Sequence, residues 1–229
     1  RTDVKAALEK VSDTEATLAV EVPSDTPDSS FGLWFAAANG PLTSRIVLVD
    51  ELATGIDNGA NHSLATAQEV TTLCAVDGTS DGTKSDHYRF HAEAGQRVAF
   101  EVQTQSIHSK MDPIARLLQA DGRVLHTSDD DSVGPDCRFS YTFAESGDYF
   151  LQVGESDYVA GGEYHLRIGD FPILHHAFPL AVREGERTKI GFTGPDASLV
   201  VASDVLIQSP SKLSLRNNHF WTVPARIAG

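Results

Sequence analysis

From Ser85 to Gly169 the sequence alternates apolar and polar residues with a period of two, in one segment after another. Such alternation is typical of strands that have one face in a hydrophobic core and the other in water. Five apolar rows share this parity: Tyr88, Phe90 and Ala92; Val98, Phe100 and Val102; Phe139, Tyr141 and Phe143; Tyr149, Leu151 and Val153; Tyr164, Leu166 and Ile168. Turn-forming pairs such as Asp121-Gly122 separate the rows. The pattern predicts an antiparallel β-sandwich, with His87, Arg89 and His91 facing away from the core.

Length and charge narrow the classes of protein to which the chain can belong. Its 229 residues suit two domains, because domains commonly hold about 100–150 residues. It carries 18 Lys and Arg against 32 Asp and Glu, a net charge of -14, which repels nucleic acid and anionic membranes. No apolar run approaches the roughly 20 residues of a membrane span. We therefore expect no nucleic-acid partner and no membrane span, and we interpret the chain, which begins at Arg1, as a piece of a longer protein.

The two cysteines, Cys74 and Cys137, are too few for a disulfide scaffold. Cys137 shares strand parity with Phe139 and Tyr141, which places it on the buried face. Two interpretations stay open: two free thiols, or one disulfide bond. We favour free thiols, because cysteine is often buried without a bond.

Residues 1–55 and 171–229 carry strand signals of their own on either side of the central region 56–170. Asp3 to Val11 fits a helical stripe or a hairpin strand, and we favour the hairpin. The run from Leu33 to Val49 resembles the closing strands of TIG-type immunoglobulin-like modules, and the run from Phe178 to Gly194 resembles an opening of one. The two flanks either pair into one composite immunoglobulin-like sandwich, which we favour, or pack separately on the central domain. Between Ala53 and Lys84 we expect a polar connector with one strand near Val70 to Ala75.

Several short motifs follow one another in a fixed order through the central region. They are Asp86-x-Tyr88-x-Phe90, Ala94-Gly95-Gln96, Met111-Asp112-Pro113, Ala120-Asp121-Gly122-Arg123-Val124-Leu125, Phe139-Ser140-Tyr141, Ser146-Gly147-Asp148-Tyr149, Gly161-Gly162 and Tyr164-x-Leu166. In order and spacing they resemble the bacterial pre-peptidase C-terminal (PPC) domain family. The resemblance implies a jelly-roll-like β-sandwich that accompanies secreted bacterial enzymes and is not itself catalytic. Related sandwiches in clostridial collagenases bind collagen and calcium.

The resemblance also implies where a calcium ion would bind. Members of the wider group that bind calcium draw ligands from an acidic linker and from an Asp-x-Asp at the entry strand. Asp57 and Asn61 match the linker ligands, and Asp86 matches the second Asp of the pair. Three positions depart from the pattern: Gly59, His62 and Lys84. These departures remove at least two oxygens and add a cation, so we expect weak calcium binding or none.

Two other features invite a metal or catalytic interpretation. The run Asp129-Asp130-Asp131 aims consecutive carboxylates in different directions, so we interpret it as a solvated acidic turn. Among nine histidines, His87 and His91 would lie about 13 Å apart on one strand, too far to share a metal ion. His175 and His176 would point to opposite faces of an extended segment. No G-x-S-x-G elbow, phosphate loop or C-x-x-C pair is present, so we expect no enzyme.

The sequence thus predicts a non-catalytic accessory or structural β-sandwich region of a secreted, periplasmic or cell-surface bacterial multidomain protein. Its partners would be the other domains of that protein. One alternative is a module that binds a polysaccharide or protein fibre through exposed aromatic side chains, with Tyr158, Phe150 and Trp34 as first candidates. A hydrolase with a cryptic site is a weaker alternative, because no nucleophile motif supports it.

Overall fold

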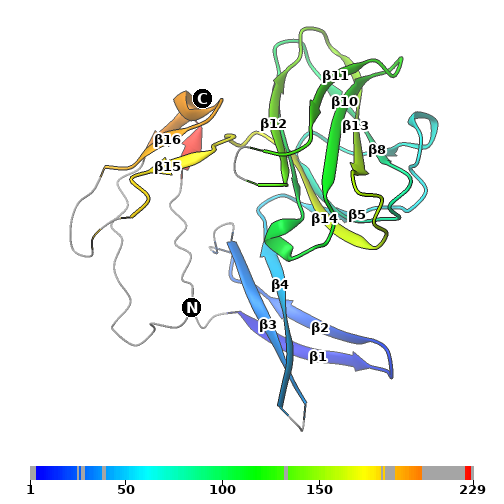
Figure 1. Cartoon of the computed structure of the whole chain (residues 1–229), viewed down its shortest axis with the longest axis vertical. Helices are drawn as coiled ribbons and strands as arrows, with labels where there is room; N and C mark the ends of the chain where they lie inside the picture. The colour runs from blue at the N-terminus through cyan, green and yellow to red at the C-terminus, as the bar shows by residue number, and fades with distance from the viewer. Residues whose placement is uncertain are drawn as a thin grey trace.

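The middle of the chain forms a β-sandwich in the computed structural model, drawn at the upper right of Figure 1. The structure describes residues 4–24, 26, 29–37, 40–131, 134–181, 183, 189–202 and 225–227. The sandwich strands are β5 Thr54–Ile56, β6 Gln68–Glu69, β7 Cys74–Ser80, β8 Asp86–Ala92, β9 Arg97–Gln103, β10 Pro113–Gln119, β11 Val124–Ser128, β12 Cys137–Thr142, β13 Gly147–Glu155 and β14 Gly162–Gly169. The first sheet has the order β11-β10-β13-β8-β6, and the second has the order β12-β9-β14-β7-β5.

Both sheets are mixed, which corrects the antiparallel sandwich predicted from the sequence. The edge strands β5 and β6 run parallel to β7 and β8, with Thr54 opposite Ala75 and Gln68 opposite Tyr88. The other pairings within the sandwich are antiparallel. The connector contributes both edge strands, and main-chain hydrogen bonds hold them to the sheets. Because these short strands are polar, their sequence shows no alternation of apolar and polar residues from which they could be predicted. The connector is therefore part of the sandwich.

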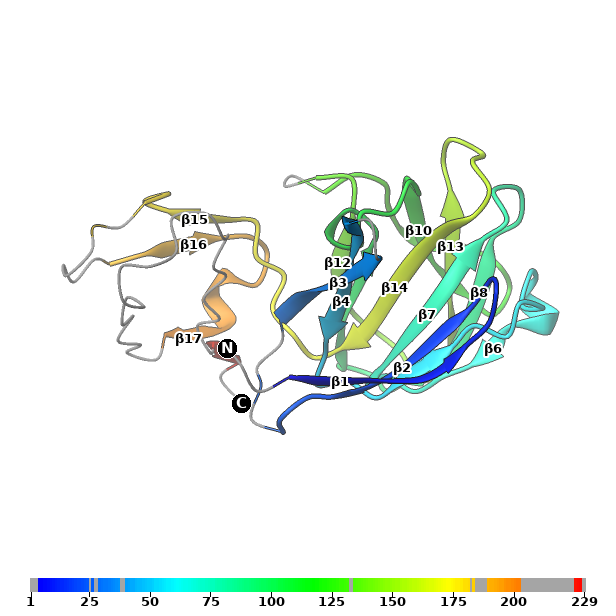
Figure 2. The same ribbon diagram turned by 90° about the horizontal axis from the view of Figure 1, so that it is seen from below.

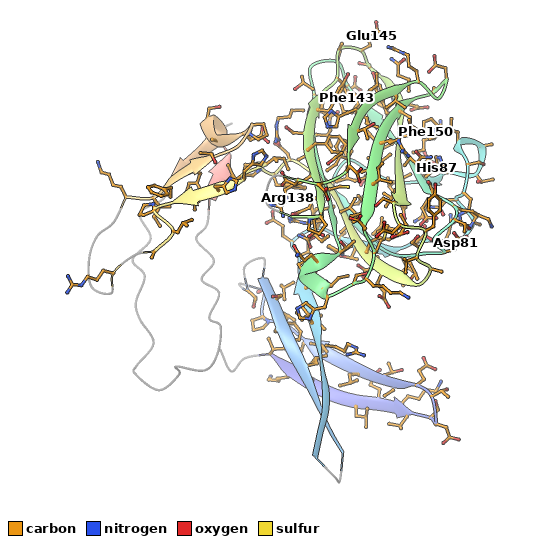
Figure 3. All side chains as sticks on the ribbon, viewed as in Figure 1. Asp81, His87, Arg138, Phe143, Glu145 and Phe150 are labelled. Atoms are coloured by element: carbon orange, nitrogen blue, oxygen red, sulfur yellow. The ribbon has the colours of Figure 1, made fainter. Side chains whose placement is uncertain are left out.

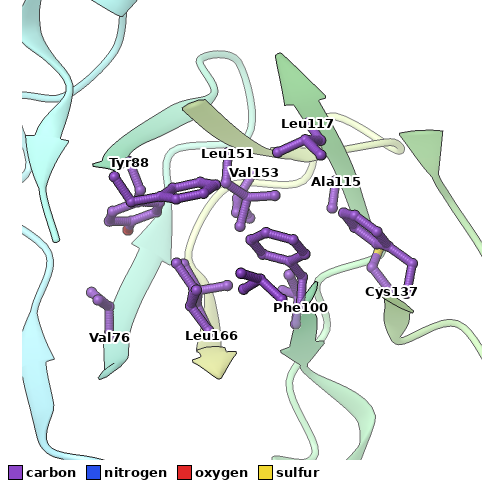
Figure 4. Packing of buried hydrophobic residues seen from close by; sticks show 14 of the residues in the cluster. Val76, Tyr88, Phe100, Ala115, Leu117, Cys137, Leu151, Val153 and Leu166 are labelled. Carbon is purple, nitrogen blue, oxygen red and sulfur yellow. The ribbon is translucent and has the colours of Figure 1, made fainter. Parts of the chain in front are cut away.

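The core between the sheets contains all five predicted apolar rows, of which only Tyr141 is partly exposed. Figure 4 shows Leu151 and Val153 of the first sheet facing Phe100 and Leu166 of the second. Burial of this kind is the main favourable term in folding. Parity alone therefore identified the core correctly.

Both cysteines are free thiols, which confirms the favoured interpretation. Cys137 is buried in the core as its parity predicts, and burial raises the pKa of its thiol to about 12. Such a thiol stays protonated and unreactive at neutral pH.

The strand expected near Val70 to Ala75 lies further along the chain, at Cys74–Ser80. A packing constraint explains why a glycine, Gly78, lies within this strand. A Cβ added at Gly78 would lie 2.2 Å from Cζ of Tyr164, so only glycine leaves room for that ring. The polar run is a strand that the ring of Tyr164 covers.

The outer face of the first sheet differs from the prediction at one position. Arg89 and His91 are exposed as expected, but His87 is only 6% exposed. The connector covers it, and His87 Nδ1 lies 3.2 Å from the carbonyl oxygen of Asn61. In Figure 3, His87 and Phe150 are labelled on this sheet.

Each flank contributes separate two-stranded sheets (Figure 2). The pairs are β1 Lys5–Val11 with β2 Ala16–Glu21, β3 Ser29–Ala37 with β4 Gly40–Val49, β15 His176–Phe178 with β16 Gly191–Thr193, and β17 Val200–Ala202 with β18 Ala225–Ile227. The first pair confirms the expected hairpin. Within the described ranges no strand of one flank shares a sheet with a strand of the other. The composite immunoglobulin-like sandwich therefore stays a prediction.

Helical structure is confined to three short 3-10 turns in the described part of the chain. They are η1 Leu64–Thr66, η2 Gln105–Ile107 and η3 Ala197–Leu199. None of the helices in these ranges has the length and apolarity needed to cross a membrane.

We predict that Tyr149→Ala lowers the free energy of unfolding by about 3–5 kcal/mol, as other large-to-small aromatic core changes do. The ring of Tyr149 packs on Phe90 and Phe143, with centroids 6.4 and 4.3 Å away. Tyr149→Phe is the control, because it removes only the hydroxyl bond to the carbonyl of Glu145 and should cost about 1 kcal/mol. Denaturant unfolding measures both, and a loss below about 1 kcal/mol for the alanine variant would contradict the packing.

Candidate functional site

The connector crosses between the sheets at the edge where β5 and β6 lie. Gln68 fixes this crossing: its Nε2 donates to the carbonyl of Ile56 (3.1 Å), and its Oε1 accepts from the amide of Asn58 (2.8 Å). Asp57 Oδ2 accepts from the amide of Gly59, whose φ of +65° lets the chain turn back. The turn brings Asp57 and Asn61 toward the interior of the sandwich, while the residues between them stay exposed.

All three residues predicted as metal candidates meet in one hydrogen-bonded cluster at this edge. Asp57 Oδ1 accepts from Asn61 Nδ2 (2.7 Å) and from the hydroxyl of Tyr88 (3.0 Å). The hydroxyl oxygens of Tyr88 and Tyr164 are 2.5 Å apart. The Tyr164 hydroxyl lies 2.8 Å from Asp86 Oδ2. We call these five residues the edge cluster. The alternation of the sequence predicts its two tyrosines as core residues and does not predict these hydrogen bonds.

Four of the five residues of the edge cluster are buried, and Asp57 is partly exposed. Asn61 and Tyr88 are fully buried, and Asp86 is 4% exposed. Burial raises the pKa of Asp86, and the charge of Asp57 raises it further against the lowering effect of the bond with Tyr164. Burial also raises the pKa of both tyrosines, so their hydroxyls keep their protons.

The edge cluster does not fit a calcium ion. N–H and O–H donors already point at both oxygens of Asp57, and Asp86 Oδ2 faces the Tyr164 hydroxyl. Asn61 Oδ1 is buried without a donor, but calcium takes six to eight oxygens. In the described part of the chain, no group of three or more His, Cys, Asp or Glu side chains could hold a metal ion.

The other residues of the calcium prediction lie apart from the edge cluster or beside it. Lys84 is exposed, and its Nζ lies 3.9 Å from Asp81 Oδ2. His62 Nδ1 lies 3.2 Å from Asp86 Oδ1. Neither departure from the ligand pattern adds an oxygen to the edge cluster.

The acidic turn is only partly solvated, which corrects the prediction for one residue. Asp129 and Asp130 are exposed, whereas the Asp131 side chain is 5% exposed. Its oxygens face Arg138 Nε (3.8 Å) and His175 Nε2 (3.4 Å). The three carboxylates therefore do not converge on one point.

A second polar cluster, on the outer face of the second sheet, was not predicted. His165 Nδ1 lies 2.6 Å from Asp77 Oδ1, and His165 Nε2 lies 3.0 Å from Asp50 Oδ2. Asp50 also accepts from Nε (2.7 Å) and Nη2 (3.0 Å) of Arg167, whose Nη1 reaches Glu101 Oε2 (3.2 Å). We call these five residues the sheet network. Asp50 follows β4, so the sheet network ties the N-terminal flank to the sandwich.

The charges of the sheet network stabilise one another. Burial lowers the pKa of His165, but the hydrogen bonds to Asp50 and Asp77 outweigh it and raise the pKa to about 9. Burial raises the pKa of Asp50, but the bonds from His165 and Arg167 outweigh it and lower the pKa to about 2. Both ring nitrogens of His165 face carboxylates, so the ring is an imidazolium at neutral pH.

The C-terminal flank is tied to the same sheet through Asp196, which is 5% exposed. Its Oδ1 lies 3.2 Å from Arg97 Nε, and its Oδ2 pairs with Arg97 Nη2. Asp196 Oδ2 also accepts from the amide of Ile173 (2.8 Å), and Oδ1 accepts from Ser140 Oγ (3.3 Å). Arg97 also donates to the exposed side chain of Asp170 (3.0 Å).

The aromatic side chains proposed for ligand binding do not form an observed platform. Tyr158 is 76% exposed, but Phe150 is only 7% exposed. The Trp34 side chain lies outside the described part of the structure, as do Phe220 and Trp221. The rings of His175 and His176 lie 6.4 Å apart and nearly perpendicular, with His175 turned toward Asp131.

Comparison with known proteins finds similarity among solved structures. The chain is similar to the pre-peptidase C-terminal domain of a collagenase from Bacillus anthracis, at 17% identity and a TM-score of 0.37, over 44% of this chain and 92% of that one. It is also similar to PliG from Aeromonas hydrophila, a periplasmic inhibitor of g-type lysozyme, at 15% identity and a TM-score of 0.33, over 50% of this chain and 98% of that one. No family model and no curated protein matches. The comparisons give no support to TIG-type flanks.

We predict that millimolar calcium or a chelator leaves the melting temperature unchanged. The reason is that a ligand that binds only the folded state must stabilise it, and the edge cluster offers no such site. Differential scanning calorimetry measures the effect, with magnesium as the control for ionic strength. A rise of several degrees that is specific to calcium would show that the cluster is a metal site.

We also predict that stability declines at alkaline pH because of His165. Its folded pKa of about 9 exceeds the ordinary 6.5, so its contribution is complete below pH 6.5 and is lost as the pH rises through 9. The loss should be on the order of 3 kcal/mol. Unfolding measured across this range tests it, and His165→Gln, which cannot titrate, is the control. Parallel pH profiles for the two proteins would contradict the imidazolium assignment.

Proposed function

We propose that this region is a non-catalytic accessory module of a secreted, periplasmic or cell-surface bacterial protein, and that it holds neighbouring segments in fixed positions. One observation carries the proposal: each flank places a buried carboxylate in an ion pair with an arginine of the same sheet. Asp50 bonds Arg167, and Asp196 bonds Arg97. The partners of the module are then the other domains of its parent protein.

Buried ion pairs of this kind suit a rigid junction. A flexible linker is solvated and keeps its charges in water. Here the side chains of Asp50 and Asp196 are both 7% exposed, and each accepts several hydrogen bonds from the sandwich. Breaking one partner of such a pair typically costs about 3–5 kcal/mol, because the other charge stays buried. Each flank is thereby held at its point of attachment.

We propose that the module is not catalytic because the groups with strongly shifted pKa values are bonded to one another. Strongly shifted pKa values occur at catalytic sites and in structural ion-pair networks. Asp50, His165 and Arg167 have large shifts and bond one another. Their charges are therefore engaged in holding the fold. The extracytoplasmic location rests on the PPC resemblance of the sequence.

Carbohydrate or fibre binding is the weaker candidate function. Such binding uses neighbouring exposed aromatic side chains. Of the two candidates whose side chains the structure describes, only Tyr158 is exposed. The exposure of one of the named candidates does not favour this function over a junction.

We predict that Asp196→Asn loosens the C-terminal flank, whereas Asp170→Asn does not. Both carboxylates bond Arg97, but the side chain of Asp196 is 7% exposed and that of Asp170 is 63% exposed. Losing the buried charge should speed limited proteolysis between residues 171 and 202 on the order of tenfold or more. Losing the exposed charge should change it little, since exposed pairs contribute about 0–1 kcal/mol.

Mass spectrometry of the fragments measures the cleavage rates in the whole chain. The sandwich itself should resist cleavage equally in both variants. Equal cleavage of the flank in Asp196→Asn and Asp170→Asn would mean that the buried pair does not hold the flank, and the rigid junction would be wrong.

A further inference from the structure

Four oxygen atoms form a continuous row in the edge cluster. In order they are Asp57 Oδ1, the Tyr88 hydroxyl, the Tyr164 hydroxyl and Asp86 Oδ2, with separations of 3.0, 2.5 and 2.8 Å. All three separations are hydrogen-bond distances between oxygens. Three hydrogen bonds need three protons.

The two tyrosines supply only two of these protons. A hydroxyl carries one proton, and an ionised carboxylate carries none. If both carboxylates were ionised, Tyr88 would donate to Asp57 and Tyr164 would donate to Asp86. The hydroxyl oxygens would then face each other at 2.5 Å with no proton between them, in a buried site. Two lone pairs so placed repel, and water is not there to screen them.

We infer that Asp86 carries the third proton, and that this proton completes the hydrogen bonding of the edge cluster. The hydrogen bonds then run in one direction: Asp86 donates to Tyr164, Tyr164 donates to Tyr88, and Tyr88 donates to Asp57. The row links β8 of the first sheet, β14 of the second and the connector. This site for a proton goes beyond the proposed function and does not depend on it.

The surroundings place the negative charge on Asp57. Three donors point at its carboxylate: the amide of Gly59, Nδ2 of Asn61 and the hydroxyl of Tyr88. A carboxylate can accept all three of these hydrogen bonds, because it carries no proton of its own. Asp57 is also partly exposed. It is therefore the anion at which the row ends.

The surroundings of Asp86 favour the neutral acid. Its side chain is 6% exposed, and the groups that face it are Asp57 and His62 of the connector and Tyr164 of β14. His62 Nδ1 is 3.2 Å from Asp86 Oδ1, but it makes no hydrogen bond of good geometry. Burial and the charge of Asp57 raise the pKa of Asp86 by more than its contacts with Tyr164 and His62 lower it. A protonated carboxyl group also satisfies the Tyr164 oxygen as an acceptor.

A matched pair of variants tests the direction of the row at pH 7. The amide introduced by Asp86→Asn can donate to Tyr164 as the protonated acid does, so the melting temperature should stay within about 2 °C of the wild type. Asp57→Asn removes the anion that accepts three donors, and the melting temperature should fall on the order of 5 °C or more. Infrared spectra of the wild type should show the C=O stretch of a buried carboxylic acid. This band should disappear in Asp86→Asn and remain in Asp57→Asn.

Three results would overturn the inference. The first is that the band is absent from the wild type at neutral pH. The second is that the melting temperature falls as much in Asp86→Asn as in Asp57→Asn or more, or that Asp86→Asn fails to fold. The third is a calcium-dependent rise in melting temperature. Flank proteolysis in Asp196→Asn tests the junction separately, since Asp196 contacts neither tyrosine.

Discussion

The hydroxyl groups of Tyr88 and Tyr164 meet inside the sandwich, and this contact determines how its open edge is closed. Both rings are buried in the core, and a buried hydroxyl without a partner is costly. The edge must therefore supply polar partners, and Asp57 and Asp86 do so. The connector has to cross at this point to deliver Asp57, and its ends pair with β7 and β8 on either side. Gly78 leaves the space that the ring of Tyr164 needs.

The same path of the chain explains how the flanks are attached. Asp50 precedes β5 by four residues, so the strand pairing that starts the connector also brings Asp50 over the second sheet. The side chains of His165 and Arg167 lie mostly buried on that face, so the carboxylate of Asp50 replaces much of the solvation that their charges lose. Asp196 meets Arg97 of the same sheet in the same way. Closure of the sandwich and attachment of the N-terminal flank are thus two results of one connector.

The sequence predicted the features that depend on the alternation of neighbouring residues. It did not predict those that depend on contacts between distant parts of the chain. Period two placed the five apolar rows correctly, because neighbouring side chains on a strand alternate whatever the rest of the fold does. The parallel edge strands and the sheet network carry no such signal: Asp50 and His165 are 115 residues apart and look like ordinary polar residues. The PPC resemblance selected Asp57, Asn61 and Asp86, which do meet. It did not indicate that two core tyrosines would bond them.

Native-state hydrogen exchange tests the central claim, that the sandwich and the attachment points of its flanks form one cooperative unit. The amides to compare are Leu52, which donates to Asp50, Ile173, which donates to Asp196, and Leu151 in the core. If the account is right, all three exchange with opening free energies close to that of global unfolding. Fast exchange at Leu52 and Ile173 beside full protection at Leu151 would show that the flanks are attached loosely, and the rigid junction would be contradicted.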